Sequence, residues 1–269
     1  MSTIGFVGSG NMAEALVKGI IAAKMYAPEN VFVSDVRAER LEFLSASYGA
    51  VPVQSNAELA AKVDAVVLSI KPQMMTEALS SIKDSIRPEA LVISIAAGIK
   101  VAKIAAVLGD MAIVRVMPNT PALIGEGTSA LFANEKAKPL LKKAMSVFTS
   151  VGKAVVVDNE DLIDAVTAVS GSGPAYYFLL MEEMIKSGVE LGLPEAVAKD
   201  LVLQTAKGAG MLAAAADRNG ESPAQLRQKV TSPGGTTEAA LKVFAEGNMG
   251  KLISAAIARA RDRARELSK

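Results

Sequence analysis

The chain has 269 residues, of which 51% are hydrophobic, and its 29 basic and 28 acidic side chains leave a formal net charge of +1. Neither cysteine nor histidine occurs, which excludes disulfide bonds, thiolate nucleophiles, zinc–thiolate sites, Ser-His-Asp hydrolases and histidine-assisted alcohol dehydrogenases. The length predicts two domains, and the balanced charge gives no indication of a nucleic-acid-binding surface.

The first predicted element is a short apolar strand, residues 4–7, which leads through a glycine turn into a helix over about residues 12–24. Gly8, Gly10 and Ala13 give this turn the spacing G-x-G-x-x-A. In dinucleotide-binding folds the first glycine permits the tight turn, the second lets the backbone approach a pyrophosphate, and the third small residue lets the helix pack on the strand. The N–H groups at the helix start then face the phosphate charge. The context favours a dinucleotide site over a merely structural strand–helix turn.

The second predicted strand, residues 31–34, ends where such folds meet the adenosine ribose of the cofactor. An acidic side chain there accepts a hydrogen bond from a 2′-hydroxyl, whereas an arginine pairs with a 2′-phosphate. Asp35 therefore favours NADH, while Ser34 and Arg37 favour NADPH. A solvated loop without a ligand is the alternative, and the choice of cofactor stays open.

Helices and strands then alternate as far as residue 159. A helix is predicted over residues 38–48, a short helix begins at a cap formed by Asn56, and Pro72 suits the first turn of another. Nearly continuous apolar runs, typical of buried parallel strands, occupy residues 64–70, 91–95 and 112–116, and short strands near 129–133 and 154–157 close the domain. The alternation predicts a parallel, doubly wound sheet, which binds ligands at the carboxyl ends of its strands. Those ends carry Gly8, Lys71, Ala97, Gly98, Asn119 and Thr120.

From residue 160 onward the pattern is helical, with Asp161 as a helix cap and a stop and restart at residues 192–194. We therefore expect one domain over residues 1–159 and a second over residues 160–269. The small residues between 206 and 216 permit close packing of helices, in the core or against another subunit. The uncharged run 165–181 is too short to span a membrane and is expected to be buried core, whereas the charged end 257–269 predicts a solvated helix.

Two glycine-rich stretches interrupt these helices, SGSGPAYY at residues 170–177 and TSPGGTTE at residues 231–238. Each brings glycines, hydroxyl groups and the start of a helix together. In the second, successive backbone N–H groups can converge on a carboxylate while hydroxyl groups add directed hydrogen bonds. The first stretch kinks a helix that also carries an aromatic pair, and it could line the same cavity as the second stretch. Either stretch alone is best interpreted as an ordinary turn, but two of them beside a dinucleotide fold favour a substrate site.

These two stretches, together with the segment Met117 to Pro121, closely resemble pyrroline-5-carboxylate reductase, and the motifs fall in family order from Gly5 to Glu238. The resemblance implies an α/β fold, with an N-terminal Rossmann-like doubly wound sheet followed by an all-α C-terminal helical dimerisation domain. It implies NAD(P)H-dependent reduction of 1-pyrroline-5-carboxylate to L-proline, the last step of proline biosynthesis. It also implies dimers whose helical domains interlock and that can assemble further. By the same resemblance, Thr237 would hydrogen-bond the ring nitrogen and residues 232–236 would hold the carboxylate.

The expected site combines both lines of argument. We expect Thr237 and Lys71 to be catalytic. The substrate-binding residues are then Ser232, Gly234, Gly235, Thr236 and Thr237. The cofactor is expected to be NADPH, with NADH as the alternative, bound by Gly8, Gly10, Asn11, Met12, Ser34, Asp35, Arg37, Asn56, Ser69, Lys71, Pro72, Ala97, Gly98 and Asn119. We expect no metal, because histidine and cysteine are absent, and no nucleic-acid or membrane partner. A cytoplasmic location is expected because no basic leader precedes the glycine turn.

Reduction of an imine suits a chain without histidine. A ketone becomes an alkoxide on reduction and needs a positioned proton donor, whereas a cyclic imine can bind already protonated, and hydride transfer then discharges its nitrogen. The protein mainly has to align the hydride donor with the acceptor carbon. A hydroxyl such as that of Thr237 can orient the nitrogen without itself titrating.

Two alternatives remain at this point. A β-hydroxyacid dehydrogenase has a similar arrangement and resembles residues 170–173, but its catalytic lysine would fall at Tyr177 here, and the next lysine is Lys186. A non-catalytic dinucleotide sensor would bind a regulatory partner through its helical half, but it would not need both glycine-rich loops.

Overall fold

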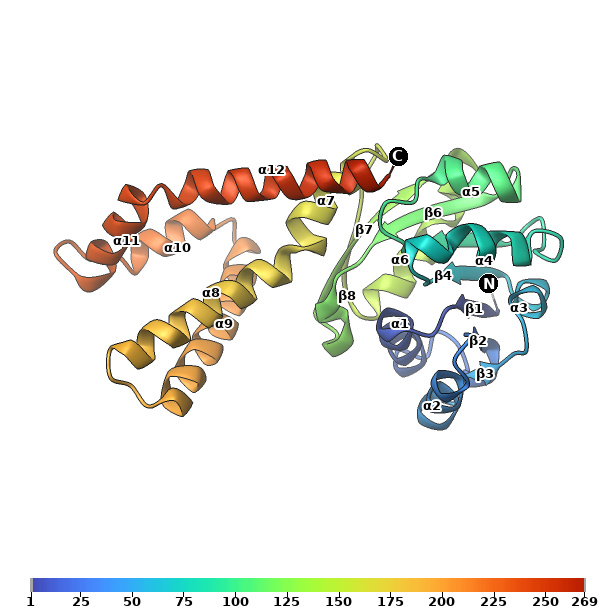
Figure 1. The fold of residues 1–269 in the computed structure, drawn as a ribbon, viewed down its shortest axis with the longest axis horizontal. Coiled ribbons are helices and arrows are strands. Elements are labelled where there is room, and N and C mark those ends of the chain that lie inside the picture. Colours follow the sequence, from blue (N-terminus) through green and yellow to red (C-terminus); the bar gives the residue numbers. More distant parts are fainter. Residues whose placement is uncertain (1, 269) are drawn as a thin grey trace. The chain divides into compact units, whose positions relative to one another are not determined.

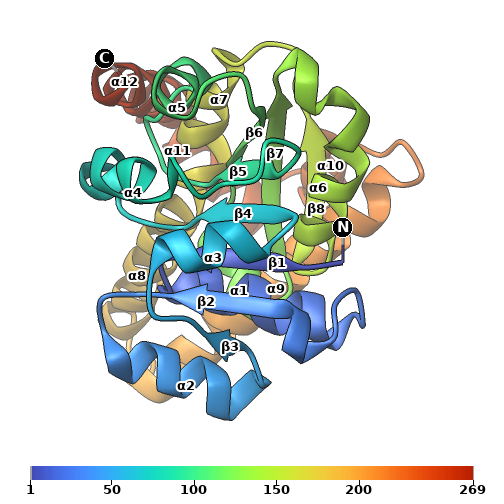
Figure 2. The same cartoon turned by 90° about the vertical axis from the view of Figure 1, so that its right-hand side faces the viewer.

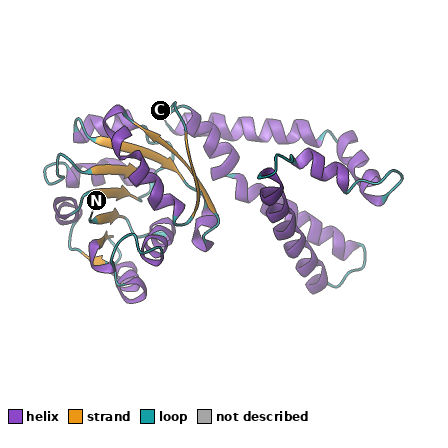
Figure 3. Ribbon diagram, turned by 180° about the vertical axis from the view of Figure 1, so that it is seen from behind, coloured by secondary structure: helices purple, strands orange, loops and turns teal. Residues whose placement is uncertain are grey.

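The computed structural model describes residues 2–268, which form two compact units (Figure 1). The first comprises residues 2–174 and 259–268, and the second is Ala175–Ala258. Within the described residues, all strands lie in the first unit, and the second unit consists of helices and their connections (Figure 3).

The first unit is built on one eight-stranded sheet (Figure 2). Its strands are β1 (Ile4–Val7), β2 (Val31–Ser34), β3 (Val51–Pro52), β4 (Ala65–Leu68), β5 (Leu91–Ser94), β6 (Ala112–Met117), β7 (Gly127–Ala133) and β8 (Gly152–Val156). Their order is β3-β2-β1-β4-β5-β6-β7-β8, and neighbours run parallel except for β6 and β7. The register pairs Val7 with Ser34 on one side and with Leu68 on the other. The carboxyl ends of β1, β2 and β4 therefore meet at the same edge.

Helices cover both faces of this sheet because its strands carry apolar side chains on both sides. On one face, α1 (Asn11–Ala22), α2 (Ala38–Tyr48) and α6 (Leu141–Thr149) share a core with Phe6 and Val67. On the other, α3 (Asn56–Lys62), α4 (Met75–Ile82) and α5 (Val101–Leu108) share a core with Val7 and Val66. Short 3₁₀ turns lie at η1 (Pro28–Asn30), η2 (Pro72–Met74), η3 (Thr120–Ile124) and η4 (Glu135–Leu140). The two helical layers confirm the predicted doubly wound sheet.

The expected helix cap at Asn56 is wrong. Ser55 caps α3 instead, and its hydroxyl accepts the N–H of Glu58 at 3.1 Å. Asn56 is the first residue of the helix, where it accepts a hydrogen bond from Ser34 Oγ at 2.7 Å and donates one to Ser81 Oγ at 3.0 Å. Two residues distant in sequence, Ser34 and Ser81, therefore bind the Asn56 side chain that the local sequence pattern predicts to cap the helix.

The helical run after the sheet begins with α7 (Leu162–Val166), passes through a π-helical turn, η5 (Thr167–Gly171), and continues as α8 (Gly173–Glu190). Asp161 holds the N-cap position of α7, as expected, but its carboxylate pairs with Lys100 Nζ at 3.0 Å and forms no cap hydrogen bond with the helix. Since α7 packs on β6 and β7, the first compact unit continues beyond the boundary expected after residue 159.

The second unit holds most of α8, together with α9 (Glu195–Asp217), α10 (Pro223–Lys229), α11 (Thr236–Glu246) and the first half of α12 (Met249–Leu267). Large apolar side chains on these helices are exposed, including Phe178 at 60%, Val243 at 66% and Leu252 at 70%. The expectation that residues 165–181 are buried core is therefore wrong for α8, on which Tyr177 is 67% exposed as well. Apolar exposure of this extent is typical of an interface.

The end of α12 belongs to the first unit. Ala264 is buried there, and the carbonyl oxygen of Leu267 lies 2.9 Å from the position that a Cβ of Gly98 would take. The expectation of a solvated helix over residues 257–269 is therefore wrong near its end. Among the described residues, no helix combines the length and the apolar character needed to cross a membrane.

Candidate cofactor and substrate sites

The glycine turn at the end of β1 is held by both neighbouring strands. The N–H of Gly8 donates to the carbonyl of Ser34 at 2.8 Å, and the hydroxyl of Ser69 donates to the carbonyl of Gly8 at 2.7 Å. Gly8 has a φ of 93°, and a Cβ there would lie 2.7 Å from the carbonyl oxygen of Ser69. The fold itself therefore requires glycine at this position.

Gly10 is glycine for a different reason. Its backbone is extended, with φ −74° and ψ −177°, and a Cβ would meet no atom of the described residues within 4 Å. It is the N-cap of α1, and no described side chain caps this helix start. Ala13, on the first turn of the helix, is 1% exposed. The uncapped N–H groups and the open space beside Gly10 fit the pyrophosphate of a dinucleotide.

Asp35, directly after β2, is enclosed by donors. Its Oδ2 accepts the N–H of Ser9 at 2.7 Å, and its Oδ1 accepts the backbone N–H and the Nε of Arg37, both at 3.0 Å. Burial raises the pKa of Asp35, but the hydrogen bonds from Arg37 and Ser9 outweigh burial and hold this pKa below its usual range. The carboxylate is 8% exposed and the Arg37 side chain 50%. The two residues that indicate rival cofactors are thus paired, and Arg37 is the member that a ligand can reach.

The remaining residues expected beside the glycine turn support it from β2 and β4. Ser34 is 3% exposed and its hydroxyl is bonded to Asn56, so this pair fixes the end of β2. The hydroxyl of Ser69 bonds to the carbonyl of Val7 at 3.1 Å as well as to Gly8. Lys71 is exposed and directly precedes η2, whose first residue is Pro72, as predicted.

The ends of β5 and β6 are tied to other parts of the first unit. Gly98 has a φ of 73° and packs against Leu267, while Ala97 is partly exposed. The amide of Asn119 is engaged on both sides, since its Nδ2 donates to the carbonyl of Ser170 at 3.2 Å and its Oδ1 accepts the N–H of Thr128 at 2.8 Å. Asn119 thereby fastens η5 to β7.

The first glycine-rich stretch forms the end of η5 and the start of α8. The N–H of Ser172 donates to the carbonyl of Thr167 at 2.8 Å, and a Cβ on Gly171 would lie 2.5 Å from Met117 Cε. The predicted interruption of the helix is therefore present as a π-helical turn, a feature frequent at functional sites, and it packs on β6.

The loop between α10 and α11, in the second unit, brings the residues expected at the substrate together. Gly234 has a φ of 71°, and its N–H donates to Glu238 Oε2 at 2.7 Å. The N–H of Gly235 donates to the carbonyl of Ser232 at 3.0 Å, and Gly235 is the N-cap of α11. Thr237 lies in the first turn of that helix and is partly buried.

Glu238 is a residue of this loop that sequence reasoning missed. A glutamate at the third position of a helix often reaches back to a backbone N–H before the helix, and this spacing is visible in the sequence. In the structure its carboxylate binds the N–H of Gly234, one of the groups expected to hold the carboxylate of a substrate. The loop therefore holds one carboxylate oxygen of its own on the N–H of Gly234.

Comparison with known proteins decides between the interpretations. A family model described as pyrroline-5-carboxylate reductase dimerisation matches residues 160–267, and one described as NADP oxidoreductase coenzyme F420-dependent matches residues 3–98. A pyrroline-5-carboxylate reductase of Pseudomonas aeruginosa is 44% identical over 100% of this chain and 98% of its own length. The chain belongs to the pyrroline-5-carboxylate reductase family. This membership confirms the resemblance and the class of NAD(P)-dependent oxidoreductases.

Solved structures of pyrroline-5-carboxylate reductases share the whole fold. The enzyme of Coxiella burnetii has a TM-score of 0.92 at 41% identity and covers 100% of this chain and 99% of its own. The enzyme of Plasmodium falciparum, solved with NADP bound, has a TM-score of 0.87 at 31% identity and covers 99% of this chain and 98% of its own. The predicted Rossmann-like sheet with a C-terminal helical domain is therefore confirmed.

The β-hydroxyacid dehydrogenase alternative gains no support over the pyrroline-5-carboxylate reductase family. A 3-hydroxyisobutyrate dehydrogenase of Mycobacterium tuberculosis has a TM-score of 0.53 at 18% identity and covers 72% of this chain and 67% of its own. At that identity the likeness shows the fold alone.

Proposed function

We propose that this protein reduces 1-pyrroline-5-carboxylate to L-proline, the last step of proline biosynthesis, with NADPH as hydride donor and NADH as the alternative donor. The full-length relatives from Pseudomonas and Synechocystis carry the name of this activity. The observation that supports the proposal best is the loop before α11, where the N–H of Gly234 binds a carboxylate oxygen, that of Glu238, at 2.7 Å, and Thr237 lies in the first turn of the helix that follows.

The first unit supplies the cofactor site in this proposal. The start of α1 and the open space beside Gly10 receive the pyrophosphate. Arg37, half exposed at the end of β2, pairs with the 2′-phosphate of NADPH. Ala97 and Gly98, after β5, line the nicotinamide end together with Lys71. The NADP bound by the Plasmodium falciparum relative supports a dinucleotide site of this kind.

The second unit supplies the substrate site. The loop of residues 232–236 binds the carboxylate of 1-pyrroline-5-carboxylate. The substrate displaces Glu238 from the N–H of Gly234, and the N–H of Gly235 leaves the carbonyl of Ser232 to bind the substrate. Thr237 hydrogen-bonds the ring nitrogen. When bound, NADPH supplies a hydride to the imine carbon. Because the protonated imine carries a positive charge that hydride transfer removes, no histidine is needed, and Thr237 has only to orient the nitrogen.

Replacing Thr237 with valine tests the proposal, because valine keeps the shape of threonine and removes its hydroxyl. Loss of a hydrogen bond to a charged group costs about 1.5 kcal/mol or more, so we expect turnover to fall by at least about tenfold. The affinity for NADPH, measured by nicotinamide fluorescence, stays unchanged. Thr149→Val, on the exposed end of α6, is the matched control and keeps full turnover. Equal turnover in Thr237→Val and in the control would refute the assignment of Thr237.

The same assay separates the alternative functions. A reductase oxidises NADPH in the presence of 1-pyrroline-5-carboxylate and forms proline. A β-hydroxyacid dehydrogenase reduces NADP⁺ with a 3-hydroxy acid instead, and a dinucleotide sensor binds NADPH without turnover of either substrate. Running NADH beside NADPH in this assay decides the preferred donor.

Self-association is part of the proposal. The match of residues 160–267 to a dimerisation family supports it, as do the exposed apolar side chains of the second unit. We propose a dimer with interlocked helical units, able to assemble further. A cytoplasmic location stays a prediction.

A further inference from the structure

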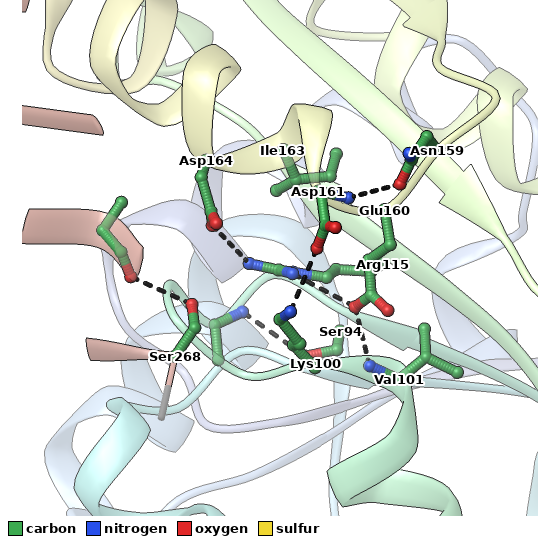
Figure 4. Close-up of polar contacts among 12 residues, drawn as sticks. Ser94, Lys100, Val101, Arg115, Asn159, Glu160, Asp161, Ile163, Asp164 and Ser268 are labelled. Carbon is green, nitrogen blue, oxygen red and sulfur yellow. Dashed lines mark hydrogen bonds and ion pairs between the residues drawn. The ribbon is translucent and has the colours of Figure 1, made fainter. Parts of the chain in front are cut away.

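A buried ionic cluster joins α7 to the sheet (Figure 4). We call Arg115, Glu160 and Asp164 the Arg115 cluster. Arg115, on β6, donates from Nη1 to Glu160 Oε1 at 3.1 Å, and its Nη2 lies 3.6 Å from Asp164 Oδ1. The side chains of Arg115 and Asp164 are 2% and 3% exposed. The proposed chemistry uses none of these three groups.

Glu160 carries a second bond that leads out of the cluster. The same Oε1 that pairs with Arg115 accepts the N–H of Val101, the first residue of α5, at 2.8 Å. The adjacent Asp161 binds Lys100 Nζ at 3.0 Å. A carboxylate at this helix start is also favoured by the helix dipole. Two successive residues at the beginning of α5 are thus held by two successive carboxylates, as Figure 4 shows.

The segment fixed in this way is the turn between β5 and α5. It contains Ala97 and Gly98, and the backbone of Leu267 packs against Gly98 from the end of α12. Residues on both sides of Ala97 in this turn, Ala96 at 4% and Ile99 at 3%, are buried. The turn therefore has little freedom once Glu160 holds the start of α5.

We propose that Glu160, held in place by Arg115, is a positioning residue for cofactor binding. It fixes the β5–α5 turn in the position in which Ala97 and Gly98 contact the nicotinamide end of the dinucleotide. The inference rests on the proposed function, which places these two residues at the cofactor. Burying a guanidinium with carboxylates gives little net stability compared with apolar side chains of the same volume. Its use here is to orient one carboxylate oxygen toward the N–H of Val101.

Three variants separate positioning from general stability. Glu160→Leu removes the acceptor, and we expect the dissociation constant for NADPH, measured by nicotinamide fluorescence, to rise by about fivefold or more. Glu160→Gln retains an acceptor oxygen for the N–H of Val101 and restores most of the affinity. Val101→Pro removes the donor instead. Proline is tolerated at the first position of a helix, and the extended backbone of Lys100 before it suits proline. We expect Val101→Pro to weaken NADPH binding as Glu160→Leu does.

Asp64→Leu is the matched control. Asp64 also accepts backbone N–H groups, from Ser2 at 2.6 Å and Thr3 at 3.2 Å, and also pairs with an arginine, Arg87, but it stands before β4 at the amino ends of the strands. Its loss lowers the melting temperature and leaves the dissociation constant for NADPH within about twofold of the wild type.

Each outcome bears on the inference. If Glu160→Leu and Val101→Pro bind NADPH as tightly as the wild type, the Arg115 cluster serves the fold alone and the inference is wrong. It is also wrong if Asp64→Leu weakens binding equally. Should Glu160→Leu fail to fold, Val101→Pro decides. If the wild type binds NADPH but forms no proline, the proposed function is refuted, while the comparison of NADPH affinities among the variants still tests the role of Glu160. If the wild type binds neither NADPH nor NADH, the proposed function and the role of Glu160 are both refuted.

Discussion

Gly8 and Gly10 stand two residues apart in one turn, and the structure predicts opposite results when each is replaced by alanine. Gly8→Ala forces a side chain into a left-handed backbone and against Ser69, so we expect the protein to lose about 2 kcal/mol or more of folding stability. Gly10→Ala keeps an allowed backbone and enters open space, so the melting temperature stays unchanged.

The cost of Gly10→Ala falls on the cofactor instead. The added methyl group occupies the space in which we expect the pyrophosphate, and the dissociation constant for NADPH should rise by about tenfold. Thermal unfolding and nicotinamide fluorescence measure the two effects separately. Tight NADPH binding by Gly10→Ala would place the pyrophosphate elsewhere.

Arg37 decides the cofactor preference in this account. Its guanidinium neutralises Asp35 in the free protein and is exposed enough to turn to a 2′-phosphate. We expect Arg37→Gln to raise the KM for NADPH by about tenfold and to change the KM for NADH little, because NADH lacks the phosphate. Arg87→Gln removes an arginine that is also paired with an aspartate, at the amino ends of the strands, and should change neither constant. An equal loss with both cofactors for Arg37→Gln would remove Arg37 from the phosphate site.

At the scale of the elements, Asp64 connects residues before β1 to the start of β4. Burial raises the pKa of Asp64, but hydrogen bonds from Ser2 and Thr3 and the charge of Arg87 outweigh burial and lower this pKa from 3.8 to about 2. Because the pKa is lower in the folded state, the carboxylate stabilises the fold fully above about pH 4, and the contribution is lost as the pH falls toward 2.

Asp64→Asn tests this linkage. The variant should unfold at lower denaturant concentration at pH 7, and the gap to the wild type should close between about pH 4 and pH 2. Denaturant titrations at a series of pH values give the free energy of unfolding directly. A gap of constant size across that range would contradict the role assigned to the carboxylate.

The elements of the first unit could be predicted well because each of them is encoded locally. Apolar runs mark β4, β5 and β6, and a helix over residues 38–48 agrees with α2 (Ala38–Tyr48). The errors arise where a distant partner takes over a side chain. The sequence predicts Asn56 as the cap of α3, yet Ser34 binds its side chain and Ser55 is the cap. Asp161 does hold the N-cap position of α7, but Lys100 binds its carboxylate in place of the helix.

In the candidate site, too, some features could be predicted from the sequence and others could not. Gly8, Gly10 and the loop before α11 have spacings that sequence alone reveals. The pairing of Asp35 with Arg37 and the bond from Val101 to Glu160 could not be predicted, because they depend on how separate elements meet. The role of Glu238 could have been found, since its position in the first turn of a helix is a local signal.

At the scale of the whole molecule, the second unit exposes large apolar side chains on several of its helices. Leu252 on α12 is 70% exposed, and large apolar side chains on α8, α9 and α11 are exposed with it. We expect Leu252→Lys to weaken the proposed dimer by burying a charge in its interface, so that sedimentation velocity shows a smaller species than the wild type forms at the same concentration. Phe43→Lys, on α2 of the first unit, is the control and leaves the dimer intact. A dimeric Leu252→Lys would show that α12 is not at the interface.

The proposed function requires the first unit to hold the reduced nicotinamide and the loop of residues 231–237 to hold the substrate. A crystal structure of the protein with NADP⁺ and proline tests this most directly. We expect the proline carboxylate on the N–H groups of Gly234 and Gly235, with Glu238 and the carbonyl of Ser232 displaced from them, and the hydroxyl of Thr237 within hydrogen-bond distance of the ring nitrogen. The nicotinamide should face the ring carbon that is bonded to that nitrogen and does not carry the carboxylate, because this is the imine carbon of the substrate. A structure in which the loop lies far from every nicotinamide in the assembly, or in which proline binds elsewhere, would contradict the account.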